Sequence, residues 1–205
     1  MPTVTDIIIQ SKNIDRANLY LDGSFRCGIS RIVLGLHNIK IGSELSDSQL
    51  EELIFESEKD RAFNYALSYI SRYTPTTKAM RNKLYEKGYT KLIVGYVIDK
   101  ATGYGYLNDT EWAKCYVEFN KTVKGTARIK QELIAKGISR DIAEQVLVGV
   151  ETNDDEVFEL ALKHSKNQDI DDPKYIARLV RFLQYRGFGG DIIWSTIDQL
   201  KVNRN

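Results

Sequence analysis

The chain has 205 residues, of which 42% are hydrophobic and 28% are charged, and its 29 basic and 28 acidic side chains nearly balance. This composition is ordinary for a globular protein, and a chain of this length can bury a substantial core without covalent staples. The two cysteines, Cys27 and Cys115, lie far apart and outside any CxxC pattern, which argues against a disulfide framework and against a zinc site.

The start of the chain and its apolar runs bear on localisation. Residues 1–6 lack the basic stretch followed by an apolar stretch that marks a secretion signal. The longest apolar run, Leu92–Ile98, has seven residues and contains Gly95, so it is too short to span a bilayer. We therefore expect a cytoplasmic protein without a membrane segment.

The first 30 residues favour strands. Asp6–Gln10, Ala17–Leu21 and Phe25–Ile29 are short runs rich in β-prone residues. Asp22-Gly23 joins the second run to the third, and this dipeptide readily adopts the positive φ angles of a tight hairpin turn. The pattern predicts a small antiparallel sheet at the N-terminus.

Helical signals follow the predicted sheet. Arg31–Leu36 is a candidate short helix, and Ile39–Leu45 is expected to return to an extended form. Ser46 is a candidate N-cap, and Gln49 three residues later completes a capping box, so a long helical region is expected to begin at Asp47. From here to the C-terminus apolar residues recur at spacings of three and four, which is typical of helices with one buried face.

A motif occurs three times at a nearly constant interval. Leu84–Tyr89, Leu133–Ile138 and Leu183–Phe188 all fit L-x-x-[KR]-G-[YIF], and their glycines are 49 and 50 residues apart. Each motif predicts a helix with a cation in its last turn, a glycine in the left-handed position after it, and an apolar residue that folds back. The match extends to apolar residues eight before, five after and ten after each glycine: Met80, Ile129, Leu179; Ile93, Ile142, Ile192; Ile98, Leu147, Ile197.

Each repeat is predicted to contain three short helices. The first helices of the three repeats are expected at Phe63–Tyr73, Thr110–Asn120 and Asp154–Ser165, and Pro173 is expected early in the middle helix of the third. We predict a mainly α fold, with three tandem three-helix repeats that form an elongated curved array after a small antiparallel β region. The expected divisions are a β-rich region at 1–46, a linker helix at 47–60, and helical repeats at 61–103, 104–150 and 151–205.

Signals for an enzyme are weak. The histidines, His37 and His164, lie near neither a cysteine nor a serine-rich elbow, and the sequence has no P-loop, GxSxG, HExxH or EF-hand pattern. We interpret His164 as a packing or surface residue, and the Gly103–Tyr106 stretch as a turn between repeats. We therefore expect no catalytic residue, cofactor or metal.

Charge is distributed unevenly, with net −4 over residues 1–60, +7 over 61–150 and −2 over 151–205. Cations on equivalent helices of stacked repeats would form a stripe that binds a polyanion through counterion release. Tyr104 and Tyr106 flank this region and are candidates for base stacking, although we interpret most tyrosines as packing. The candidate residues for filament or nucleic-acid binding are Lys78, Arg81, Lys83, Lys87, Lys121, Lys124, Arg128, Lys130 and Lys136.

Further short motifs lie around the three repeats, in a fixed order over residues 60–200. The motifs are Leu84–Tyr89, Gly105–Asp109, Trp112-Ala113, Tyr116-Val117, Lys124-Gly125, Arg128-Ile129, Glu132-Leu133, Lys136–Ser139, Phe182-Leu183 and Arg186–Phe188. In order and spacing they resemble the RecX regulatory family. The sequence departs from the family at Gly125-Thr126-Ala127, where the family usually has Gly-Pro before Arg-Ile.

The resemblance implies a DNA-repair regulator that binds the RecA filament on single-stranded DNA. Such a protein inhibits the recombinase, ATPase and co-protease activities of RecA and so modulates the SOS response. The expected partners are the RecA filament and single-stranded DNA, with double-stranded DNA as a further candidate, and the expected state is a monomer. Two alternatives stay open: a helix-turn-helix-like DNA-binding transcriptional regulator and a protein-interaction scaffold.

Overall fold

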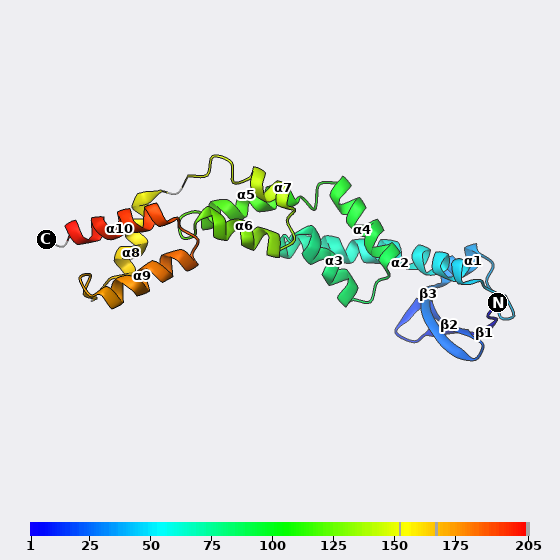
Figure 1. Cartoon of the computed structure of the whole chain (residues 1–205). Helices are drawn as coiled ribbons and strands as arrows, with labels where there is room; N and C mark the ends of the chain where they lie inside the picture. Colours follow the sequence, from blue (N-terminus) through cyan, green and yellow to red (C-terminus); the bar gives the residue numbers. More distant parts are fainter. Residues whose placement is uncertain (152, 167, 204–205) are drawn as a thin grey trace. The chain divides into compact units, whose positions relative to one another are not determined.

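The structure, a computed structural model, describes residues 1–151, 153–166 and 168–203. Within these residues the chain forms ten helices and one three-stranded antiparallel sheet (Figure 1). The chain divides into two compact units: the first comprises Met1–Pro75 and Met80–Leu107, and the second comprises Thr76–Ala79 and the chain from Asn108 onward. The mainly α fold with an N-terminal sheet is confirmed.

The predicted sheet opens the first unit. Strands β1 (Val4–Gln10), β2 (Asn13–Leu21) and β3 (Ser24–Ser30) pair antiparallel in the order β1-β2-β3. Asp22 has φ 47° and Gly23 has φ 79°, so both central residues of the β2–β3 turn are left-handed, as a tight hairpin of this type requires. The predicted hairpin is confirmed.

Two helices follow the sheet, α1 (Arg31–Leu36) and α2 (Asp47–Tyr73). The predicted capping box is present, because Ser46 Oγ accepts from Gln49 N at 3.2 Å and Gln49 Oε1 accepts from Ser46 N at 2.9 Å. The segment expected to be extended, residues 39–45, contains turns and one isolated bridge, between Glu44 and Thr3.

Helix α2 is continuous for 27 residues, whereas the sequence suggested a linker helix that ends at residue 60 before the first repeat. No glycine or proline interrupts this span, so nothing local stops the helix. Its first half buries Leu50 and Leu53 in the sheet's hydrophobic cluster, and its second half buries Ala62, Phe63 and Ala66 in the next cluster. One helix therefore contributes to two cores, and Figure 1 shows the blue sheet beside its first part.

The rest of the first unit completes the three-helix arrangement expected for repeat 1. Helices α3 (Thr77–Glu86) and α4 (Lys91–Gly103) bury Met80, Leu84 and Ile93 in one cluster together with the second half of α2. Thr90 caps α4, since its hydroxyl accepts from Ile93 N at 3.5 Å.

The second unit contains two further three-helix groups. The first is α5 (Asp109–Asn120), α6 (Thr126–Ala135) and α7 (Arg140–Gln145), and the second is α8 (Asp154–His164), α9 (Pro173–Tyr185) and α10 (Gly190–Val202). Pro173 occupies the first position of α9, where its missing N–H costs nothing. Each group buries its own apolar cluster, as the repeat pattern predicts.

The three repeated motifs end α3, α6 and α9 in the same way. Gly88, Gly137 and Gly187 have φ angles of 85°, 94° and 85°. The residue after each glycine donates its N–H to the carbonyl of the motif leucine five residues earlier, at 3.0–3.2 Å, and the glycine donates to the carbonyl three residues back at 2.9 Å. These two hydrogen bonds define a Schellman cap, so the predicted C-terminal structure of the motif is confirmed.

Two of the motif glycines also make a close contact with another repeat. The Gly125 N–H donates to Arg186 O at 2.9 Å, and a Cβ on Gly125 would collide with the Gly187 carbonyl. A Cβ on Gly187 would lie 2.5 Å from Arg128 Cβ. The end of α9 thus lies against the start of α6, at a distance that only glycines permit. The contact lies at the start of α6, where this sequence lacks the proline that is usual in the family it resembles.

The equivalent contact recurs one repeat earlier. A Cβ on Gly137 would collide with the Lys78 side chain, and Thr76 Oγ1 donates to Lys136 O at 2.9 Å. The last carbonyls of α6 are therefore satisfied at the start of α3. Nothing lies within 4 Å of a Cβ built on Gly88, the third motif glycine. We call the Gly187–Gly125 and Gly137–Lys78 pairs the inter-repeat contacts.

Candidate nucleoprotein interface

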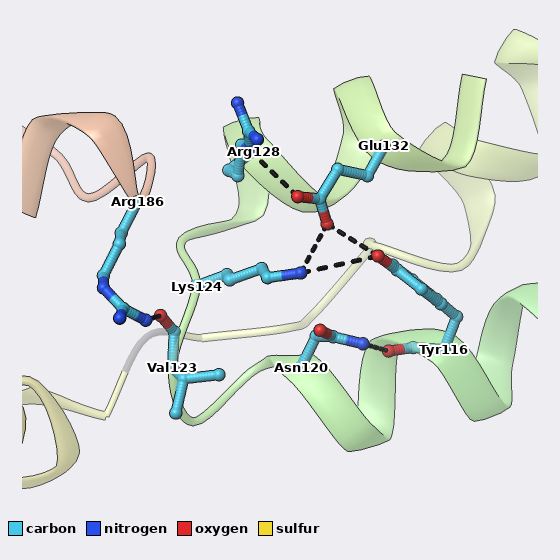
Figure 2. A network of polar contacts seen from close by, with 7 residues as sticks. All are labelled: Tyr116, Asn120, Val123, Lys124, Arg128, Glu132 and Arg186. Carbon is cyan, nitrogen blue, oxygen red and sulfur yellow. Dashed lines mark hydrogen bonds and ion pairs between the residues drawn. The ribbon is translucent and has the colours of Figure 1, made fainter. Parts of the chain in front are cut away.

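Two of the predicted cations converge on one carboxylate in the second unit (Figure 2). Lys124 Nζ lies 2.7 Å from Glu132 Oε2, and Arg128 Nε lies 2.9 Å from Glu132 Oε1. The Tyr116 hydroxyl donates to Glu132 Oε2 at 2.6 Å and also accepts from Lys124 at 3.5 Å. The carboxylate therefore fixes both cations in place.

The electrostatics of Glu132 follow from this geometry. Partial burial opposes ionisation, but hydrogen bonds from Lys124, Tyr116 and Arg128 outweigh it and lower the pKa of Glu132 to about 2. The pKa of Tyr116 is raised, first by burial and then by its hydrogen bond to the Glu132 carboxylate. At neutral pH the cluster thus holds an ionised glutamate, two cations and a neutral phenol.

Local structure explains how these side chains meet. Tyr116 lies on α5, Lys124 lies in the loop before α6, and Arg128 and Glu132 lie one turn apart on α6. An i, i+4 spacing places Arg128 and Glu132 on one helix face. Figure 2 also shows Arg186, which donates to the carbonyl of Val123 in the α5–α6 loop at 3.1 Å. The third repeat therefore helps to fix the loop that carries Lys124.

A surface cavity of about 390 Å³ adjoins this cluster. It contains three cations and one carboxylate, for a net charge of +2 at neutral pH. The Arg128 guanidinium lies 4.9 Å from the ring centroid of Tyr185, which is 72% exposed, and the Arg186 guanidinium lies 4.7 Å from that of Phe182. The cavity thus combines fixed positive charge with aromatic rings. It is lined by Lys124, Arg128, Glu132, Phe182, Tyr185 and Arg186.

Four of the six lining residues are not among the binding residues predicted from the sequence. Arg186 occupies the [KR] position of the third motif, where the second motif has Lys136, so the repeat itself pointed to it. The cations predicted from charge all lie in the basic middle of the chain, and Arg186 lies outside it. Tyr185 gives no signal beyond helical spacing. Phe182 is among the residues that carry the family resemblance, and Glu132 lies four residues after Arg128, which is the spacing of a helical ion pair.

The other predicted cations of the second unit are held individually. Lys78 Nζ donates to Ala135 O at 3.3 Å, at an inter-repeat contact. Lys136 Nζ lies 5.9 Å from the ring centroid of Trp112 and 5.5 Å from that of Tyr116. Two further lysines form ion pairs, Lys121 with Glu118 at 2.7 Å and Lys130 with Glu144 at 2.8 Å.

Three predicted cations belong to the first unit. Lys83 Nζ pairs with Glu86 at 2.8 Å and lies 6.0 Å from the ring centroid of Tyr69. Lys87 Nζ lies 5.3 Å from the ring centroid of Tyr65, and Arg81 is exposed on α3. A single stripe that joins the cations of both units stays a prediction.

His164 has the packing role expected for it. Its Nδ1 lies 3.1 Å from the Tyr175 hydroxyl, and its ring centroid lies 4.2 Å from that of Phe182. Within the described residues, no group of three or more His, Cys, Asp or Glu side chains is placed to hold a metal ion, and no helix is long and apolar enough to cross a membrane.

Comparisons with known proteins agree with this architecture. The family model for the RecX regulatory protein N-terminal domain matches residues 2–46, and the models for the second and third RecX three-helix domains match 108–147 and 154–197. Among solved structures, a crystal structure of regulatory protein RecX aligns with a TM-score of 0.65 at 23% identity, over 97% of this chain and 100% of the other. RecX from Lactobacillus salivarius aligns with a TM-score of 0.63 at 27% identity, over 71% and 97%.

Relatives by sequence carry the same name. Regulatory protein RecX of Bacillus subtilis is 32% identical over 100% of this chain and 80% of its own length. Regulatory protein RecX of Clostridium perfringens strain 13 is 30% identical over 99% of this chain and 98% of its own length. This is a family of regulatory proteins and not of enzymes. With its N-terminal sheet, its three-helix groups and relatives that match over its whole length, the chain belongs to the RecX regulatory protein family.

Proposed function

We propose that this protein binds the filament that RecA forms on single-stranded DNA and inhibits the filament's recombinase, ATPase and co-protease activities. Through this inhibition it modulates DNA repair and the SOS response. The observation that carries the proposal is the cavity of Lys124, Arg128 and Arg186, where three cations and exposed Tyr185 surround a single carboxylate. Fixed cations beside aromatic rings suit a nucleic-acid strand.

The mechanism is steric and electrostatic, without a chemical step. Glu132 holds Lys124 and Arg128 in fixed positions, so binding costs little side-chain entropy. A phosphate that enters the cavity meets cations that are already oriented. The bound protein then hinders motions between RecA subunits and access of a second strand, which recombination requires. The other predicted cations contribute long-range attraction to the filament.

The test replaces the two central cations with neutral side chains. Charge reversal is unsuitable, because glutamate at position 124 or 128 would repel Glu132 and disrupt the local structure. In the Lys124→Gln, Arg128→Gln double variant we expect weaker inhibition of RecA-catalysed ATP hydrolysis on single-stranded DNA. We also expect the slope of log Kd against log[salt] to fall in magnitude by about 0.7 for each lost phosphate contact.

The matched control is the Lys163→Gln, Lys201→Gln double variant, which removes the same charge from exposed positions on α8 and α10. This control is expected to inhibit like the parent chain. Circular dichroism and urea unfolding establish that both variants are folded. Equal inhibition and equal salt dependence in the two double variants would contradict the role of the cavity, and a parent chain that leaves RecA activity unchanged would contradict the proposed function itself.

A further inference from the structure

A row of tyrosines follows one face of α2 in the first unit. Tyr65, Tyr69 and Tyr73 are spaced four residues apart, which places them on one side of a helix at intervals of about 6 Å along its axis. Their ring centroids are 6.4 Å apart for the first pair and 4.7 Å for the second. Tyr89, just after the Schellman cap of α3, has its ring centroid 6.5 Å from that of Tyr65. We call these four residues the tyrosine row.

Lysines from the end of α3 lie over the same rings. Lys83 Nζ lies 6.0 Å from the ring centroid of Tyr69, and Lys87 Nζ lies 5.3 Å from that of Tyr65. Lys83 also pairs with Glu86, but the Glu86 side chain is 64% exposed, so this pair is screened by solvent and easily exchanged. The Lys83 ammonium can therefore exchange Glu86 for another anion, and Lys87 is exposed at the end of the same helix.

The tyrosine row is not simply part of the core. Tyr65, Tyr69 and Tyr89 pack against the first-repeat cluster and remain half-buried. Tyr73 is 62% exposed, whereas Phe63 on the same helix is 9% exposed. Core packing accounts for Phe63, but it does not account for an exposed ring that continues the row at Tyr73.

Positive charge continues beyond the row. A cavity of about 260 Å³ adjoins Lys87 and Tyr89, and Arg16, Glu58 and Arg61 also line it. Arg16 forms an ion pair with Glu58 at 2.5 Å. The cavity has three cations, Arg16, Arg61 and Lys87, and one carboxylate, so its net charge is +2. A strand stacked on the tyrosines would find cations along its phosphates at Lys83, at Lys87 and in this cavity.

We propose that the tyrosine row is a stacking platform for the bases of single-stranded nucleic acid, with Lys83 and Lys87 contacting the phosphates. This site lies in the first unit and rests on the proposed function, because the filament presents such a strand. Stacking on exposed aromatic rings with cations alongside is a sequence-tolerant mode of binding single strands. A duplex hides its base faces, so the tyrosine row is expected to prefer single strands.

The experiment uses the full chain and a fluorescent oligo(dT) strand, with binding followed by fluorescence anisotropy. Tyr69→Leu and Tyr73→Leu remove the ring and keep an apolar side chain, whereas Tyr73→Phe keeps the ring. We expect each leucine variant to bind about 10-fold more weakly, the double variant more weakly still, and Tyr73→Phe to bind like the parent chain. Phe119→Leu is the matched control, because it also replaces an exposed aromatic ring with leucine, at a position on α5 that is 84% exposed and lies outside the tyrosine row.

A second measurement locates the bound strand directly. An oligonucleotide that contains 5-iodouracil crosslinks under ultraviolet light to aromatic side chains stacked on it, and peptide mass spectrometry then identifies the residue. Crosslinks at Tyr73 or Tyr69 are the expected result. This readout remains informative if the Tyr69→Leu variant unfolds, because the parent chain is used.

The outcomes separate this site from the proposed function. If Tyr73→Leu binds oligo(dT) like the parent chain and no crosslink falls in the tyrosine row, the platform is overturned, even where the parent chain inhibits RecA. If the leucine variants lose RecA inhibition but bind oligo(dT) like the parent chain, the tyrosine row is a protein contact, and the platform is also overturned. If the parent chain binds oligo(dT) through the tyrosine row but does not inhibit RecA, the platform stands and the proposed function fails.

Discussion

At the scale of single residues, Glu132 determines the geometry of the candidate site. The sequence indicated the cations that a polyanion would need, and it indicated them from charge alone. It did not indicate that Lys124 and Arg128 share one carboxylate, because Lys124 lies eight residues from Glu132 and comes near it only through the turn into α6. Charge patterns identify candidates, whereas pairing depends on the folded path of the chain.

The lowered pKa of Glu132 makes stability depend on pH in a defined direction. Its folded value of about 2 lies below the ordinary 4.5, so the ionised carboxylate stabilises the fold at neutral pH. That contribution, on the order of 1–3 kcal/mol after allowance for solvent screening, is lost as the pH falls from about 4.5 through 2. We expect Glu132→Gln to lower the free energy of unfolding at pH 7 and to have little effect near pH 2.

Urea unfolding of the parent chain and Glu132→Gln at pH 7, 4 and 2.5 checks this expectation. Other carboxylates titrate in both proteins, so the difference between the two curves isolates Glu132. Glu144→Gln is a useful comparison, because its partner Lys130 also lowers the pKa of Glu144, but on an exposed pair. A difference between parent and Glu132→Gln that stays constant across this pH range would contradict the assignment.

At the scale of elements, most of the fold was predictable because its signals are local. Ser46 with Gln49, the Asp22-Gly23 turn and the three motif glycines each determine a cap or a turn within a few residues. The inter-repeat contacts were not predictable, because they join residues about 60 positions apart. The glycines of the second and third motifs have two roles, a left-handed backbone conformation and a close contact. The local sequence predicts the backbone conformation but not the contact.

Two N-cap glycines allow the close contact to be tested without a change in backbone conformation. Gly125 and Gly189 are both N-caps with φ −71°, so alanine causes no backbone strain at either position. Gly125 abuts the Gly187 carbonyl, whereas nothing lies within 4 Å of a Cβ on Gly189. We expect Gly125→Ala to lower the free energy of unfolding by about 1–3 kcal/mol more than Gly189→Ala, as steric overpacking does. Urea unfolding of the two variants measures this difference, and equal losses would show that the contact yields without cost.

At the scale of the whole molecule, the N-terminal sheet was predicted as a separate region, and its packing explains why it is needed. Leu50 and Leu53 of α2 are each 2% exposed because the sheet's cluster covers them. Ser57 on the same helix accepts from Ser30 N at 2.8 Å. A terminal repeat needs a cap over its apolar face, and the N-terminal region is a candidate for that cap, but apolar spacing does not identify which partner covers a helix face.

Removal of the sheet is therefore expected to expose an apolar helix face. A chain that begins at residue 47 should retain helical circular dichroism but self-associate, as measured by size-exclusion chromatography with light scattering. The same truncated chain with Leu50→Gln and Leu53→Gln should recover the elution of a monomer. A truncated chain that stays monomeric without these substitutions would contradict a covering role for the sheet.

The unbroken α2 helix has a consequence for how members of this family diverge. Each residue turns a helix by about 100°, so inserting or deleting one residue between Leu53 and Ala62 would rotate one set of buried side chains away from its core. Changes of length are tolerated in loops, but in this part of α2 they would destabilise the fold. Relatives that pack this helix on both cores should keep the same number of residues between these two positions, even where nearly every side chain in the interval has been replaced.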